Sequence, residues 1–387
     1  MLTVSRVDRP YPNRIPDPDL DTMVADIVEQ VRFSSTDIEL RLRSPNLRIE
    51  RTSSAADLDA RTEILFGHQT ILMGGGLYPF LCQYLRAASS YFLTCNQGGT
   101  PAPNWHAGRS SLATTLDWLS TPTEMPHLPA FTISRTQDKS ALSLAFYTYR
   151  FLLCHELAHV ALGHSPIEAG SVPDNITPLH QQQDQELKTD RMALTLQVRS
   201  IPTRSETVKG LAGAVYAFAA EALRNSRLML LAELVDERQW EIELTHPPTI
   251  QREFGLLGAA NGLCGQAAMT DMHRLRNDLR ELNDQVLTDA LHQQQMVVEE
   301  ARQLLRIEMD TLRLRGNDPL PAVLPDLLGL FSQSPVGVMK ALEHPPNNAS
   351  DDTSAIASLI DRFVAELPAE FQDFHNQSPR ERAIDLA

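Results

Sequence analysis

The sequence has few cysteines and no long hydrophobic run, and each shortage excludes a class of protein. Its 4 cysteines (Cys82, Cys95, Cys154 and Cys264) form no Cys-x-x-Cys pair, which favours reduced core thiols over a disulfide framework. No apolar stretch approaches the roughly 18 residues of a membrane span, and the first 19 residues lack the apolar segment of a secretory signal. We therefore expect a soluble, cytoplasmic protein.

Basic residues are also in short supply. The 387 residues include 34 Lys and Arg against 49 Asp and Glu, a formal net charge of −15. Because nucleic-acid backbones and anionic lipid surfaces are bound by basic faces, this balance argues against nucleic acid and membrane as partners. Hydrophobic residues make up 42% of the chain, so the composition is otherwise that of a globular protein.

The spacing of apolar residues predicts a mainly α fold with a small β-sheet (α+β). Helices are expected over 20–33, 77–92, 139–163, 181–198, 207–232 and 266–315, and strands within 63–73 and 131–134. The Gly- and Pro-rich segment 96–129 favours a loop. We divide the chain into an N-terminal α+β region (1–125), a catalytic core (126–262), a long-helix region (263–345), and a linker with a C-terminal helix (346–387).

The segment 266–315 contains neither glycine nor proline. Its apolar residues follow helical spacing from Met272 to Val286, and the stripe then blurs. Two interpretations stay open, a coiled-coil arm or two helices with a disguised break. In either case the long helix is a candidate surface for a protein partner.

One motif in the chain carries chemistry. His155-Glu156-Leu157-Ala158-His159 is an H-E-x-x-H sequence inside an apolar helical run. Residues four apart share one helical face, so both imidazoles can ligate one Zn²⁺, while Glu156 can hold the attacking water and accept its proton. Polar groups in an apolar helix are costly unless they are paired or bind a metal. The alternative is two satisfied core histidines with a salt-bridged glutamate.

A catalytic zinc takes three protein ligands, and Glu186 is the best candidate for the third. Glu186 and Asp190 share one face of a predicted helix, where Asp190 can accept a hydrogen bond from a ligating imidazole. His164 follows the glycine that ends the first helix, and we expect it to cap that helix or to face solvent. Cys154 is expected to pack in the core, and His180 is a weaker alternative ligand.

A further segment follows the helix expected over 207–232. Its sequence is Thr245-His246-Pro247-Pro248-Thr249-Ile250-Gln251-Arg252. Its prolines end the preceding helix and can present His246 to the metal site, where a donor would stabilise the oxyanion of a tetrahedral intermediate. Arg252 can bind a carboxylate, either near Asp190 or on the substrate. The alternative is a helix-breaking turn with a surface histidine.

The chain resembles the gluzincin metallopeptidases in three segments and in their order. These segments are HELAHVALGH, ELKTDRMA and THPPTIQR. The arrangement is most like the prenyl-protein and heat-shock endopeptidase family, and it is also similar to the soluble Lit-type phage-exclusion peptidases. The resemblance implies a zincin-like core with helical N- and C-terminal additions and zinc as cofactor. It implies His155, His159 and Glu186 as ligands and Glu156 as the base. It also implies a peptide substrate on an edge strand, for which 131–134 is the candidate.

We therefore predict a soluble zinc endopeptidase, with a role in bacterial stress or phage defence suggested by the resemblance alone. In this hypothesis His246 and Arg252 support the oxyanion, and Asp190 orients a ligating imidazole. The chain departs from the membrane family in lacking transmembrane helices and in placing Glu253 after Arg252. The competing hypotheses are a restrained or inactive peptidase-like protein that binds a partner, and a zinc amidohydrolase with a non-peptide substrate.

Overall fold

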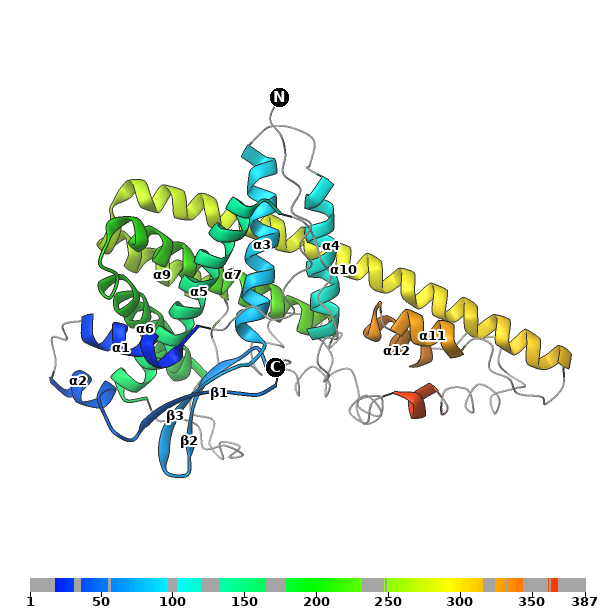
Figure 1. Cartoon of the computed structure of the whole chain (residues 1–387), viewed down its shortest axis with the longest axis horizontal. Coiled ribbons are helices and arrows are strands. Elements are labelled where there is room, and N and C mark those ends of the chain that lie inside the picture. The colour runs from blue at the N-terminus through cyan, green and yellow to red at the C-terminus, as the bar shows by residue number, and fades with distance from the viewer. Residues whose placement is uncertain are drawn as a thin grey trace. The chain divides into compact units, whose positions relative to one another are not determined.

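The computed structural model describes residues 18–30, 36–54, 57–96, 103–119, 133–164, 179–231, 247, 249–315, 324–331, 333–343, 361 and 363–367. The protein is mainly α-helical with a small three-stranded sheet (Figure 1), which confirms the predicted fold class. The chain divides into two compact units. Unit 1 comprises Met1–Gly108, Ala130–Leu223 and Asp236–Asn283, and unit 2 comprises Arg109–Pro129, Arg224–Val235 and Asp284–Ala387. The four-part division at residues 125, 262 and 345 stays a prediction.

The predicted helices are present with their ends moved by a few residues. The helices of the described residues are α1 (Leu20–Gln30), α2 (Thr36–Leu42), α3 (Leu77–Asn96), α4 (Pro103–Leu119), α5 (Arg135–Leu162), α6 (Leu179–Arg199), α7 (Arg204–Leu231), α9 (Thr249–Cys264), α10 (Gln266–Arg315), α11 (Leu324–Phe331) and α12 (Pro335–Glu343). The C-terminal helix expected after residue 345 falls largely outside them, although 363–366 are helical.

The loop expected across 96–129 is wrong in its middle, where α4 runs from Pro103 to Leu119. Proline fits the first position of a helix, because its missing N–H has no intrahelical partner there. Leu112, Ala113 and Leu116 share one face of α4 and are buried. Burial of this face outweighs the low helix propensity of the glycine, serine and threonine residues around it.

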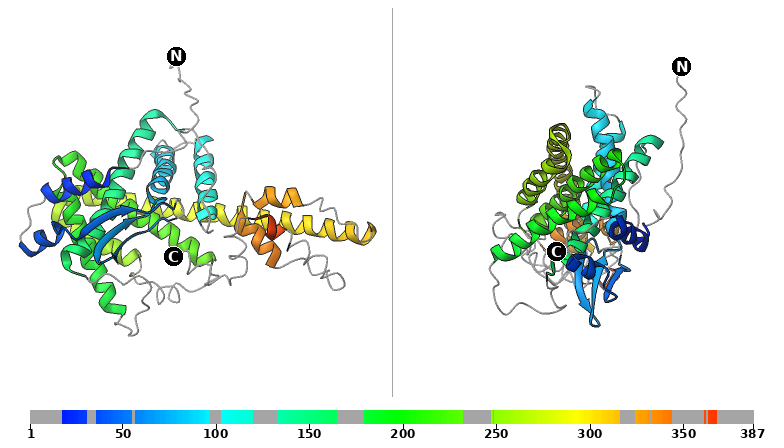
Figure 2. Two further views of the ribbon diagram at one scale, coloured as in Figure 1. Left: turned by 60° about the horizontal axis from the view of Figure 1, so that its bottom comes forward. Right: turned by 90° about the vertical axis from the view of Figure 1, so that its left-hand side faces the viewer.

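The sheet has the strand order β1–β3–β2. β1 (Leu47–Arg51) pairs in parallel with β3 (His68–Met73), and β2 (Ala60–Leu65) pairs with β3 antiparallel. β1 and β2 are therefore the two edges of this sheet. Figure 2 shows from two further sides that the strands lie beside α1, which contacts β1.

Two predictions about strands need correction. The segment 63–73, expected to hold one strand, is part of a hairpin whose turn residues Phe66 and Gly67 have φ of 52° and 78°. Two positive φ values are what a two-residue type I′ turn requires. The edge strand expected at 131–134 is wrong at its described end, because Ser134 is the N-cap of α5. Phe131 and Thr132 lie outside the described residues.

α5 is the central helix of unit 1 and packs against α3 and α6 (Figure 1). It begins with a capping box, in which the Ser134 hydroxyl accepts from Gln137 N–H and the Gln137 side chain accepts from Ser134 N–H. It ends at Gly163, which has φ 70° as a left-handed C-cap. Its apolar run is buried on nearly every side, as the sequence predicts.

α10 is one continuous helix of 50 residues, so the two-helix interpretation is wrong. Met272, Leu279, Leu282 and Val286 of the apolar stripe are buried within this chain. Further along, α10 contributes to the core of unit 2 through Val297, Ala301 and Leu305, which pack with α11 and α12. Its use as a surface for a protein partner stays a prediction.

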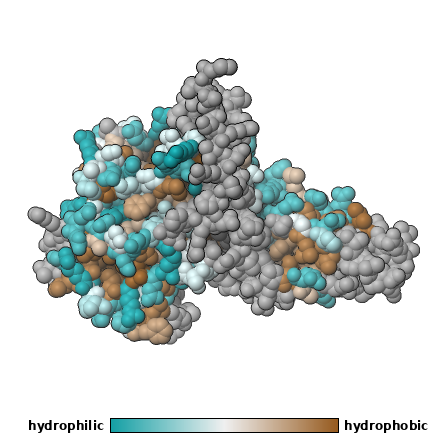
Figure 3. Space-filling view, viewed as in Figure 1, coloured by the Kyte–Doolittle hydropathy of each residue, from teal (hydrophilic) through white to brown (hydrophobic). Residues whose placement is uncertain are grey.

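No described helix combines the length and the apolar character needed to cross a membrane. The face of unit 1 drawn in Figure 3 is mostly hydrophilic, with hydrophobic patches between the polar residues.

Candidate metal centre

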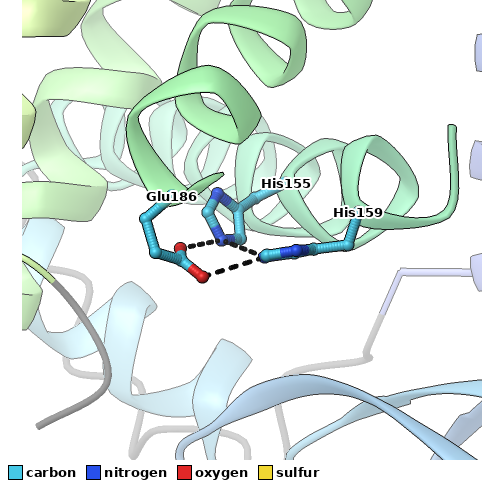
Figure 4. Close-up of side chains that lie close together, drawn as sticks. All are labelled: His155, His159 and Glu186. Atoms are coloured by element: carbon cyan, nitrogen blue, oxygen red, sulfur yellow. Dashed lines mark hydrogen bonds and ion pairs between the residues drawn. The ribbon is translucent and has the colours of Figure 1, made fainter. Parts of the chain in front are cut away.

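Two histidines and a glutamate converge between α5 and α6 (Figure 4). His155 and His159 lie one turn apart on α5, and their Nε2 atoms are 3.1 Å apart. Glu186 projects from α6, with Oε2 3.2 Å from Nε2 of His155 and Oε1 3.4 Å from Nε2 of His159. The structure thus brings together the three residues that the sequence selects as ligands.

The three side chains could together hold a metal ion. Each offers one ligand atom, and these atoms lie within 4.8 Å of one another. The side chains of His155 and Glu186 are only 6% and 11% exposed, and such buried polar groups need a compensating partner.

Asp190 lies behind the first histidine. Its Oδ1 is 3.0 Å from Nδ1 of His155, the ring nitrogen that faces away from Glu186. Burial opposes a charge on this imidazole, but the carboxylates of Asp190 and Glu186 outweigh burial and raise the pKa of His155 to about 10. Burial alone would raise the pKa of the Asp190 carboxyl. The guanidinium of Arg252 outweighs burial and holds this pKa well below its usual range.

Arg252 is buried, 4% exposed, and binds two carboxylates. Its Nε and Nη2 donate to Asp190 at 2.9 and 2.8 Å, and its Nη1 donates to both oxygens of Glu221 at 2.8 and 3.0 Å. The guanidinium carbon also lies 4.8 Å from the centroid of the Phe218 ring. Of the two carboxylate partners considered from the sequence, the structure places Asp190 on Arg252. A role at the oxyanion stays a prediction.

The departure from the family pattern at Glu253 has a structural explanation. Glu253 is buried, and its Oε2 accepts from Nε of Arg276 and from Nη2 of Arg280, both at 2.7 Å. Both arginines lie on α10, so the charge at position 253 ties α9 to α10 within unit 1. This contact anchors the helix that carries Arg252.

Glu156 contacts the sheet. Its Oε2 accepts a hydrogen bond of 2.8 Å from Oγ1 of Thr62, which lies on the edge strand β2. Burial raises the pKa of Glu156, an effect that His159, His155 and the Thr62 hydroxyl only partly oppose. A raised pKa suits a carboxylate that must accept a proton near neutral pH. Sequence analysis missed Thr62, because an isolated threonine 94 residues before its partner gives no motif.

His164 caps the helix, which is one of the two alternatives expected from the sequence. Its backbone N–H donates to the carbonyl of His159 at 3.1 Å. Its ring is half-buried and lies against the site, with Nδ1 3.0 Å from Nδ1 of His159.

His246 and the side chain of His180 lie outside the described residues. The predicted role of His246 as a donor to the oxyanion is therefore still a prediction. Pro247 is buried, and α9 begins two residues later at Thr249.

Residues 106–262 match the protein-family model described as Peptidase U49. The match spans less than half of the chain and includes α5, α6 and Arg252, but it ends before α10 and contains none of the sheet. It supports a peptidase related to the Lit-type peptidases. Comparisons with curated proteins and with solved structures give no significant match.

Proposed function

We propose that this protein is a zinc-dependent endopeptidase, a more specific assignment than the peptidase role that the family match supports. One observation carries the proposal: His155, His159 and Glu186 bring their donor atoms around one point, and the buried carboxylate of Glu156 lies on the same helix. Two imidazoles and one carboxylate are a donor set of catalytic zinc sites, which keep a further position open.

Zinc bound by these three residues would polarise the scissile carbonyl and lower the pKa of a water molecule. Glu156 accepts the proton of the attacking water and then delivers it to the leaving amine. Thr62 orients this carboxylate through its hydrogen bond to Oε2. Asp190 orients the imidazole of His155 and is itself fixed by Arg252.

An extended peptide has a place to bind beside Glu156. β2 is an edge of the described sheet, and its residues 60–65 all lie opposite residues of β3. Because the hairpin turn has two residues, residues 61, 63 and 65 are the ones that form hydrogen-bonded pairs with β3. The backbone groups of Ala60, Thr62 and Ile64 therefore point to the outer side of the strand. A substrate chain that adds to this edge would lie next to the residue that holds the base. In this proposal β2 takes the place of residues 131–134 as the substrate-binding strand.

Elemental analysis of the purified protein tests the metal site. We expect about one zinc per chain in wild type and its loss in His155→Ala and in Glu186→Ala. Glu29→Ala is the matched control, because Glu29 is an exposed glutamate of α1. Wild type that stays free of zinc after zinc is supplied, with the fold checked by circular dichroism, would overturn the proposal.

Glu156→Gln tests the chemistry separately from the metal. The amide keeps the shape of the side chain but cannot accept a proton, so we expect zinc to stay bound and cleavage to fall by about 10²-fold or more. Cleavage is measured by mass spectrometry on a library of peptides derived from a bacterial proteome. Turnover at the wild-type rate in this variant contradicts the assignment of Glu156 as the base.

Two further measurements on the zinc-loaded protein separate the competing hypotheses. A panel of small amides cleaved in place of peptides would favour a zinc amidohydrolase. A zinc-loaded protein that cleaves neither but retains a stoichiometric protein partner would favour the regulatory module.

A further inference from the structure

We propose that His164 is a positioning residue, which fixes the tautomer of His159 so that Nε2 is free to ligate the metal. This inference rests on the proposed function and deepens it. The ring of His164 contacts the outer nitrogen of His159.

The two nitrogens of His159 have different partners. Nε2 faces the cluster, 3.1 Å from Nε2 of His155 and 3.4 Å from Glu186, whereas Nδ1 lies 3.0 Å from Nδ1 of His164. A neutral imidazole carries one proton, so ligation through Nε2 requires the proton on Nδ1. Nδ1 of His164 accepts a hydrogen bond from this N–H group. The ring of His164 then carries its own proton on Nε2.

The end of α5 explains why His164 reaches that position. Gly163 takes a left-handed conformation and turns the chain back over the last turn of the helix. Arg41 covers the turn, because its Nη1 donates to the carbonyl of Ala161 at 2.9 Å. A Cβ on residue 163 would approach Nη1 of Arg41 to 2.6 Å. The left-handed conformation of residue 163 therefore favours glycine, and the turn delivers residue 164 to the outer side of His159.

A second helix contacts the same ring nitrogen. Oγ1 of Thr189, on α6, lies 3.3 Å from Nδ1 of His164, and its one proton is donated to the carbonyl of Gln185 at 2.9 Å rather than to the ring. Thr189 is fully buried, so the position of its hydroxyl is fixed by packing. The ring of His164 is thus set by α5 and α6, the two helices that supply the metal ligands.

Each ligating histidine in this arrangement has its own outer partner. Asp190 contacts Nδ1 of His155, and His164 contacts Nδ1 of His159. Loss of an outer partner of this kind weakens metal binding by roughly 10–100-fold in metalloproteins, because the ligand loses its fixed tautomer and orientation.

The test compares two variants of His164 in the full chain, with zinc alone as the probe. His164→Ala removes the acceptor, and His164→Asn replaces Nδ1 with an amide oxygen at a similar position. Zinc affinity is measured by competition with a chelator. We expect a roughly 10–100-fold loss for His164→Ala and recovery of most of it in His164→Asn. His68→Ala is the control, because His68 lies on β3 and contacts Arg48 rather than the cluster.

A second measurement on wild type does not depend on a variant that folds. Nitrogen-15 NMR of the zinc-bound protein is expected to show His159 protonated on Nδ1 and His164 protonated on Nε2. The opposite tautomer of His164 would overturn the inference, because that ring would have no acceptor for His159.

The outcomes separate this inference from the proposed function. Wild type and His164→Ala with equal zinc affinity, or Ala and Asn variants weakened alike, would overturn the positioning role alone. Complete loss of zinc in His164→Ala, matching His155→Ala, would make His164 a ligand and would also overturn it. Wild type that binds no zinc would overturn the proposed function, and the inference with it.

Discussion

Both carboxylate oxygens of Asp190 accept hydrogen bonds from the guanidinium of Arg252, at 2.9 and 2.8 Å. The same arginine binds Glu221 on α7, and the same aspartate contacts His155 on α5. A continuous line of charged groups therefore runs from the candidate metal ligand across four helices. Every member but Glu221 is nearly fully buried, so the line is rigid and each charge depends on its neighbours.

Removal of Arg252 should destabilise the fold. Arg252→Leu leaves the carboxylate of Asp190 buried without its main partner, and breaking a buried pair in this way costs about 3–5 kcal/mol. Unfolding in urea measures the loss. Arg43→Leu is the control, since the Arg43 side chain is 52% exposed in its pair with Glu39, and we expect a change within about 0.5 kcal/mol. An unchanged midpoint for Arg252→Leu would show that Asp190 finds another partner or is neutral.

Zinc affinity should rise with pH. In the metal-free protein the pKa of His155 is raised to about 10, so below this pH the ring carries two protons. One proton must leave before Nε2 can ligate, which makes affinity increase by up to roughly tenfold per pH unit up to pH 9. Chelator competition at pH 6, 7 and 8 measures the slope.

Asp190→Asn is the informative comparison for this slope. The amide removes one of the two carboxylates that raise the pKa of His155, so proton release on zinc binding should decrease near neutral pH. A wild-type affinity that does not change with pH would contradict a protonated His155.

Most helices were predictable, because the spacing of apolar residues indicates which segments form helices with a buried face. The run before His155 predicts α5, and its burial confirms the prediction. The capping box from Ser134 to Gln137 is a signal of the same local kind, and its serine three residues before a glutamine could have corrected the strand expected at 131–134. α4 was missed because glycine and serine residues obscure its apolar face, which only tertiary burial reveals.

The site was predictable only in part, because some of its contacts join segments that are far apart in the sequence. The pairing of the candidate ligands His155 and His159, and that of Glu186 with Asp190, follow from helical spacing, since residues four apart share a face. Thr62 depends on a contact between a strand and a helix far apart in the chain, and no local pattern encodes it. The contact of the His164 ring with His159 could not be predicted, because the path of the chain after Gly163 depends on a turn that Arg41 and Thr189 contact.

Cys154 should be inert although it precedes a candidate ligand in the sequence. Burial raises the pKa of its thiol to about 12, and the side chain is fully buried, with Sγ 3.9 Å from Oε1 of Gln197. The reactive thiolate is therefore absent at pH 8. Mass spectrometry after iodoacetamide treatment should find Cys154 modified in urea but at least ~100-fold more slowly in the native protein. Rapid native labelling would mean that α5 opens on the timescale of the reaction.

Thr62 should control the pH at which Glu156 works. The hydroxyl donates to Oε2 of Glu156 and so favours the ionised carboxylate, against the burial that raises its pKa. Thr62→Val keeps the shape of the side chain and removes this donor, so the pKa of Glu156 rises further. Because the base acts only when it is ionised, activity should fall more at pH 6 than at pH 8.

The readout for Thr62 is the acid limb of the profile of kcat/KM against pH, which should move to higher pH in Thr62→Val. Thr62→Ser restores the donor and should return the limb toward its wild-type position. The zinc content of both variants should equal that of wild type, because Thr62 contacts the base and none of the three ligands in the described structure. An unmoved limb in Thr62→Val, or an equal shift in Thr62→Ser, would mean that β2 does not set the ionisation of Glu156.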